Sequence, residues 1–100
     1  MLFRSNGIPF NILSYGILLS LIAREVNMVS GELIGYLGDS HIYLNQLEGV
    51  REQLKNDPYK YKLPTLWLNP DVKNLSDFKF EDIKIENYES YPSIKFPLSN

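Results

Sequence analysis

The chain has 100 residues and a mass of 11.6 kDa, which is enough for one small domain or for part of a larger one. Ten basic against twelve acidic residues give a net charge of -2, so there is no electrostatic case for binding nucleic acid or an anionic membrane. The absence of cysteine excludes a disulfide framework, a thiolate zinc site and a cysteine nucleophile, and a single histidine excludes a multi-histidine metal site.

A helix is predicted over residues 11–27, where apolar residues fall on almost every side of the helical wheel. Such a helix needs cover on most sides, and a chain of this length has few other elements to provide it. We therefore expect the cover to come from a second subunit or from chain that precedes Met1 in a longer relative. The apolar run 12–23 is too short to cross a bilayer and no leader pattern is evident, so the chain is expected to be cytoplasmic, without a membrane partner.

The rest of the chain alternates between short strands and helices. Three strands are predicted where short apolar or alternating runs lie between turn residues: 33–37, 65–68 and 83–88. Helical spacing predicts a helix over 42–55 and a single helical turn within 74–80, whereas residues 59–62 and the tail 91–100 are expected to be extended. The mixture indicates an α+β fold in one unit spanning residues 1–100, with a buried helix packed on a twisted sheet.

The first candidate site lies at the N-terminus. Arg4 and Ser5 offer a guanidinium fork and a hydroxyl, which suit a phosphate, although an ordinary charged N-terminus explains the same pair. Asn11 begins the predicted helix, where its side chain would cap a backbone N–H. Its alternative role is base recognition, because a carboxamide presents a donor beside an acceptor and so complements the O4 and N3–H of uracil.

The second candidate site lies in the middle of the chain. His41 and Tyr43 are two residues apart, so in extended backbone both side chains point to the same side and could hold a sugar hydroxyl. The alternative is that His41 caps the predicted strand end and Tyr43 packs in the core. Asp39 is predicted to be the N-cap of the helix that follows. The tail 93–100 is either an edge strand or a flap that closes over a ligand.

Five motifs follow one another in a characteristic order: Arg4-Ser5-Asn6, Gly7-Ile8-Pro9-Phe10-Asn11, Gly31-Glu32-Leu33-Ile34, Gly38-Asp39-Ser40-His41-Ile42-Tyr43 and Ser93-Ile94-Lys95-Phe96-Pro97. Their order and spacing resemble the C-terminal part of thymidylate synthase, from about Arg4 to the end of the chain. The resemblance implies a homodimer with an α/β sandwich-like arrangement around a large twisted sheet. It also implies reductive methylation of deoxyuridylate (dUMP) to dTMP, with 5,10-methylenetetrahydrofolate as the co-substrate.

The resemblance also implies roles for individual residues. On the dUMP side it assigns the phosphate to Arg4 and Ser5, the pyrimidine edge to Asn11, and the deoxyribose hydroxyl to His41 and Tyr43. On the folate side it assigns Gly7, close to the base and the cofactor, and the C-terminal segment that closes over the folate, with Lys95 and Pro97.

Two departures from the family pattern bear on function. The family reads R-S-x-D-x-x-L-G-x-P-F-N, whereas here Gly7 follows Asn6 directly, so the Asp-x-x-Leu stretch that helps order the site is absent. The cysteine that adds to C6 of uracil is also absent, and a serine hydroxyl is not acidic enough to replace it. The chain alone is therefore expected to bind substrate without turnover, and activity could return with an N-terminal portion.

Two alternatives stay open. One is a non-catalytic remnant or interaction domain that keeps the architecture without the reaction. The other is the related deoxycytidylate hydroxymethylase. Asn11 argues against it, because the N4 amino group and unprotonated N3 of cytosine are matched better by an aspartate.

Overall fold

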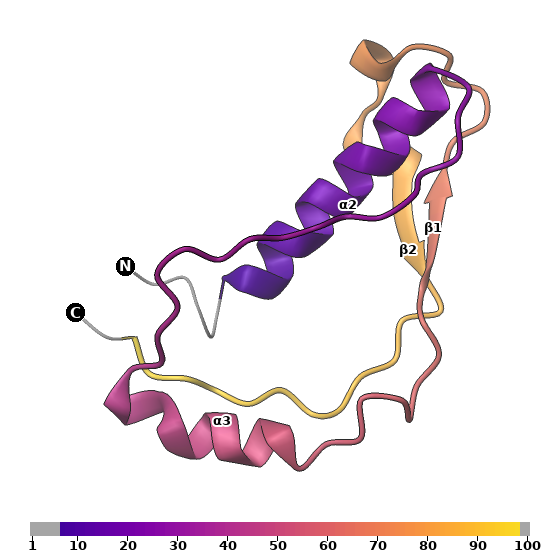
Figure 1. Cartoon of the computed structure of the whole chain (residues 1–100). Helices are drawn as coiled ribbons and strands as arrows, with labels where there is room; N and C mark the ends of the chain where they lie inside the picture. Colours follow the sequence, from indigo (N-terminus) through magenta and orange to yellow (C-terminus); the bar gives the residue numbers. More distant parts are fainter. Residues whose placement is uncertain (1–6, 99–100) are drawn as a thin grey trace.

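A computed structural model describes residues 7–98 of the chain. In chain order its elements are α2 (Ile8–Glu25), η1 (Leu44–Gln46), α3 (Leu47–Leu54), β1 (Thr65–Leu68), η2 (Leu75–Asp77), η3 (Phe80–Asp82) and β2 (Ile83–Glu86), where η marks a 3-10 turn. Helices combined with a small antiparallel sheet confirm the predicted α+β class (Figure 1).

The long helix α2 begins three residues earlier than predicted. Pro9 lies in its first turn, where the missing N–H is tolerated and the fixed φ suits a helix, and Gly7 is the N-cap. Asn11 is therefore inside the helix, where its backbone N–H donates to the Gly7 carbonyl at 3.1 Å, and the prediction that Asn11 is the N-cap is wrong. At the other end Asn27 takes a left-handed φ of 56°, which stops the helix.

Strands β1 and β2 form an antiparallel pair in which Thr65 faces Glu86 and Leu68 faces Ile83. The strand predicted over 65–68 is confirmed, whereas the one predicted over 83–88 ends at Glu86. The reason is Asn87, whose φ of 58° turns the backbone away from the ladder. The helical turn predicted within 74–80 is present as η2.

The strand predicted over 33–37 is wrong. The backbone from Met28 to Tyr43 forms no helix or strand, and Tyr36 is 92% exposed. In the described chain the apolar run pairs with neither β1 nor β2, and a strand without a partner is not stable. The helix predicted over 42–55 is confirmed in its middle but begins later, with η1. Tyr43, in extended backbone, is the N-cap of η1, so the prediction of Asp39 as a helix N-cap is wrong.

The described chain has very little core. Ala23 is its only buried apolar residue, and Phe10 on α2 is 72% exposed. The accessible surface is 8591 Å², whereas a compact monomer of this mass exposes about 5,800 Å². The radius of gyration of 16.5 Å is likewise larger than the value of about 13 Å for a compact chain of this length. The apolar residues of α2 thus stay largely uncovered, in keeping with the expectation that 100 residues provide too little cover.

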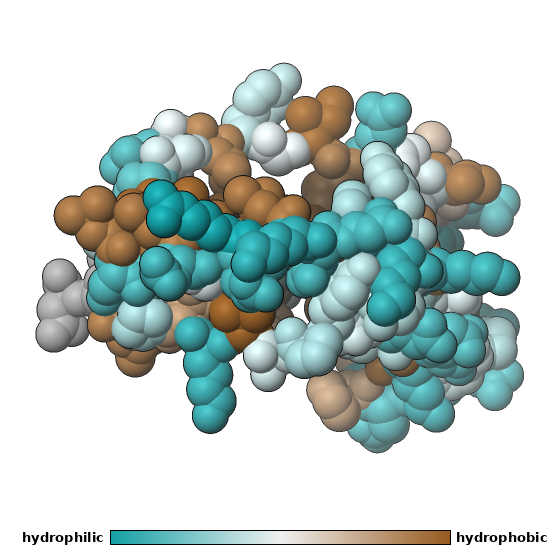
Figure 2. Space-filling view, turned by 90° about the horizontal axis from the view of Figure 1, so that it is seen from below, coloured by the Kyte–Doolittle hydropathy of each residue, from teal (hydrophilic) through white to brown (hydrophobic). Residues whose placement is uncertain are grey.

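The face that carries α3 has a polar centre. Figure 2 shows hydrophilic side chains across the middle of this face, with hydrophobic groups exposed on both sides of it. Within residues 7–98, no helix combines the length and the apolarity needed to cross a bilayer.

Candidate functional site

The centre of the candidate site is the pair His41 and Tyr43. Both side chains are half-buried, and their rings meet edge to face with centroids 5.0 Å apart and planes at 86°. The predicted same-side placement of the two side chains is thus observed, and no strand precedes them for His41 to cap. The exposed Asp39 carboxylate lies 3.6 Å from Nδ1 of His41, close enough for electrostatic attraction but beyond hydrogen-bond distance.

The loop that carries this pair returns to the start of α2. Ser40, His41 and Ile42 line a hollow of about 290 Å³ together with Ile8 in the first helical turn. Asn11 is one turn further along, and residues three apart are neighbours on a helix surface. Its side chain is exposed and does not line this hollow. The structure thus brings the imidazole–phenol pair to the beginning of the helix that carries the carboxamide.

Gly7 precedes this first turn as the N-cap, with its carbonyl bound to the Asn11 N–H. The predicted phosphate ligands Arg4 and Ser5 lie outside the described residues.

The C-terminal tail lies along α3 as an extended segment without strand pairing, so the edge-strand alternative for residues 93–98 is wrong. Lys95 and Pro97 are exposed on it, and the Pro97 carbonyl accepts a 2.8 Å hydrogen bond from Nε2 of Gln46. The Tyr91 hydroxyl accepts a 3.2 Å hydrogen bond from the backbone N–H of Asp57. Sequence reasoning missed Gln46 and Tyr91 because both contacts link segments far apart in the chain.

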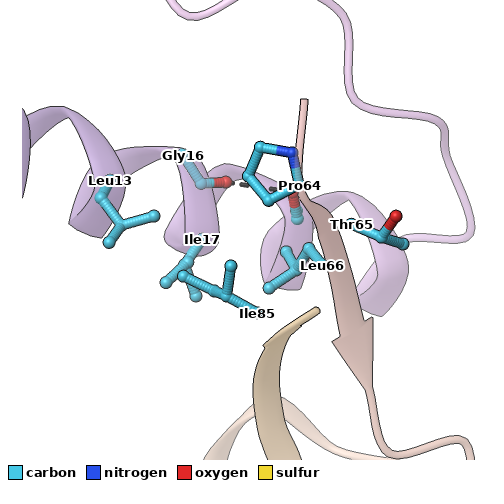
Figure 3. Close-up of a pocket in the computed structure, with 8 residues that line it drawn as sticks. Leu13, Gly16, Ile17, Pro64, Thr65, Leu66 and Ile85 are labelled. Carbon is cyan, nitrogen blue, oxygen red and sulfur yellow. Dashed lines mark hydrogen bonds between the residues drawn. The ribbon is translucent and has the colours of Figure 1, made fainter. Parts of the chain in front are cut away.

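A second feature is an apolar hollow between α2 and the antiparallel pair of strands β1 and β2, shown in Figure 3. Leu13, Ile17 and Leu66 approach Ile85 there around a volume of about 240 Å³. Two further hollows, of about 570 and 430 Å³, also include Leu13 and Ile85. The Ser20 hydroxyl, which also lines this hollow, donates a 3.0 Å hydrogen bond to the Gly16 carbonyl. This lining suits the side chains of additional protein better than a phosphorylated nucleotide.

Comparisons with known proteins identify the fold to which these features belong. The family profile described as thymidylate synthase matches residues 4–100. The chain belongs to the thymidylate synthase family. It is 56% identical over 89 residues to a thymidylate synthase of Mycoplasma mobile, an alignment that covers 89% of this chain and 30% of that protein.

Two other relatives agree. Thymidylate synthase of Leuconostoc mesenteroides is 47% identical over 93 residues, covering 93% of this chain and 28% of that protein. The solved structure of thermostable thymidylate synthase A from Bacillus subtilis has a TM-score of 0.87 at 32% identity, covering 94% of this chain and 33% of the other. The chain thus spans about 30% of the length of the curated thymidylate synthases that it matches.

Proposed function

We propose that residues 1–100 act as the C-terminal, nucleotide-binding part of a cytoplasmic thymidylate synthase. In this proposal dUMP is held by Asn11, His41, Tyr43, Arg4 and Ser5, and the folate co-substrate by Gly7, Lys95 and Pro97. The observation that supports it best is the pairing of His41 with Tyr43 at the start of α2, within a chain of this family.

The local chemistry suits a deoxyribose hydroxyl. A carboxylate beside Nδ1 of His41 favours the tautomer with the proton on Nδ1, which leaves Nε2 to accept a hydrogen bond. The Tyr43 hydroxyl can donate or accept. An imidazole and a phenol placed edge to face can therefore share one sugar hydroxyl, while the Asn11 carboxamide reads the O4 and N3–H of uracil.

The reaction itself needs chain beyond this one. Because the chain has no cysteine, the thiolate that adds to C6 of uracil must come from elsewhere. The accessible surface area supports the same conclusion. Its excess over that of a compact monomer of this mass is several times the roughly 800 Å² that each partner buries in a standard interface. We infer that the chain complements an N-terminal portion of the same fold and that the completed units form the homodimer. When bound, 5,10-methylenetetrahydrofolate supplies the one-carbon unit and the hydride.

A non-catalytic, thymidylate synthase-like interaction domain is the second candidate. It is favoured by the missing cysteine and by the missing Asp-x-x-Leu stretch before Gly7.

Calorimetry with dUMP separates the two candidates. The sample is this chain mixed with the part of the Mycoplasma mobile enzyme that precedes the matched region. Saturable binding that is lost in Asn11→Ala and kept in the control Asn56→Ala supports the first candidate, and absence of binding supports the second. A tritium-release assay should detect dTMP formation in the mixture and none with the chain alone. Turnover by the chain alone contradicts the proposal.

A further inference from the structure

The C-terminal tail and α3 run in opposite directions beside each other (Figure 1) and are joined at both ends. At one end Tyr91 is bound to the backbone that follows α3, and at the other Gln46 is bound to Pro97. Gln46 is only 3% exposed, less than any other buried residue of the described chain. The hydrogen bond to Pro97 is therefore made by one of the few buried residues of the described chain.

Between these attachments the aromatic ring of Phe96 lies against Gly49 of α3. A Cβ atom on Gly49 would lie 2.5 Å from Cε1 of Phe96 and 3.0 Å from Cδ1. Because such distances are shorter than real contacts allow, any side chain at this position would displace the ring. A Cβ on Gly16 in α2, by contrast, would meet nothing within 4 Å. Gly49 is the third residue of α3, and the lack of a side chain at this position leaves the room that the ring occupies.

The packing of Phe96 on Gly49, here called the seat of Phe96, determines which way the side chains of the neighbouring residues point. Successive side chains of an extended segment point to opposite sides. Phe96 is half-buried on α3, whereas Lys95 and Pro97 are exposed. With the ring seated on Gly49, the two neighbours thus face away from the helix.

We propose that Gly49 is a positioning residue. The gap it leaves in α3 seats Phe96, and this seat holds Lys95 and Pro97 in place. The link from the seat to the cofactor rests on the proposed function, in which Lys95 and Pro97 face the folate, whereas the seat itself is independent of it.

Trypsin tests the seat directly on the full chain, because the Lys95–Phe96 bond is a cleavage site next to the ring. Gly49→Ala should speed cleavage after Lys95 by about tenfold, since crowding a packed site shifts the tail toward a detached state. The matched control Gly16→Ala should leave this rate unchanged. Cleavage after Lys84, in β2, reports general unfolding and should not change in Gly49→Ala.

A double-mutant cycle identifies the partner. Phe96→Ala should also speed cleavage after Lys95, and Gly49→Ala should add nothing further in the Phe96→Ala background. The proposal is overturned if Gly49→Ala has no effect, if it speeds cleavage after Lys84 equally, or if its effect persists in full without the ring.

The kinetic consequence is measured in the mixture with the N-terminal portion. Gly49→Ala should raise the KM for 5,10-methylenetetrahydrofolate about tenfold, as expected when the tail is detached most of the time, and leave the KM for dUMP unchanged. Equal changes in both values contradict a role on the folate side. Absence of turnover in the unmutated mixture contradicts the proposed function, while the cleavage experiment still decides the seat.

Discussion

The side-chain amide of Asn69 donates a 2.7 Å hydrogen bond to the carboxylate of Asp82, and so joins the end of β1 to the residue that precedes β2. The other carboxylate oxygen accepts the backbone N–H of Lys79 at 2.9 Å. The hydrogen bond from Asn69, followed by the one from Lys79, lowers the pKa of Asp82, because both favour the charged carboxylate.

A lowered pKa makes stability depend on pH with a definite sign. The unfolded carboxyl titrates at about pH 3.9, so the contribution of Asp82 is complete above that pH and is lost as the pH falls through the lower folded-state pKa. We expect Asn69→Ala to raise the pKa of Asp82, measured by carboxyl-carbon NMR. The control Asp71→Asn removes a nearby exposed carboxylate and should leave that titration in place. An unchanged Asp82 pKa in Asn69→Ala contradicts the assignment.

Arg24 should be important for the stability of the described fold. Its Nη1 and Nη2 donate 2.7 Å hydrogen bonds to the carbonyls of Asn69 and Val72, which ties the end of α2 to the turn after β1. Arg24→Ala should lower the free energy of unfolding by about 2 kcal/mol, measured by urea denaturation. Lys55→Ala removes an exposed pair with Glu52 and should leave the midpoint unchanged. Equal shifts in the two variants disprove a special role for Arg24.

Tyr43→Phe tests the proposed contact with the deoxyribose hydroxyl without removing the ring that meets His41. Loss of the hydroxyl should weaken dUMP binding about tenfold in the complemented mixture, with no change in helix content by circular dichroism. Tyr59→Phe is the matched control, because Tyr59 is exposed and away from the pair. Unaltered dUMP affinity in Tyr43→Phe removes the hydroxyl from the site.

Gly16→Ala should stabilise α2. A Cβ at this position meets nothing within 4 Å, and alanine in a helix interior is more stable than glycine by about 0.5–1 kcal/mol. The urea midpoint should therefore rise. A lower midpoint contradicts the open space that the structure shows beside Gly16.

The sequence predicted the elements that local residues determine. Strand 65–68 was identified from its apolar run between turn residues, and the same-side placement of His41 and Tyr43 followed from their spacing. Element ends were less predictable, because they depend on backbone choices such as the early start that Pro9 permits and the left-handed φ of Asn87. The strand over 33–37 failed because pairing depends on a distant partner edge, which apolar composition does not reveal.

The site was predictable only in part for the same reason. The motif around His41 and Tyr43 is local and carries the family resemblance. The contact of Gln46 with Pro97 links residues that are 51 positions apart, and no periodicity or turn signal indicates such a pair. That Gly49 makes room for Phe96 is likewise visible only once α3 and the tail are placed together.

The uncovered apolar side of α2 has a consequence for the thermal stability of the chain. Since whatever binds only the folded form stabilises it by mass action, the melting temperature of the chain should rise with the concentration of the protein that covers this helix. A thermal midpoint measured on the purified chain alone then describes only that solution.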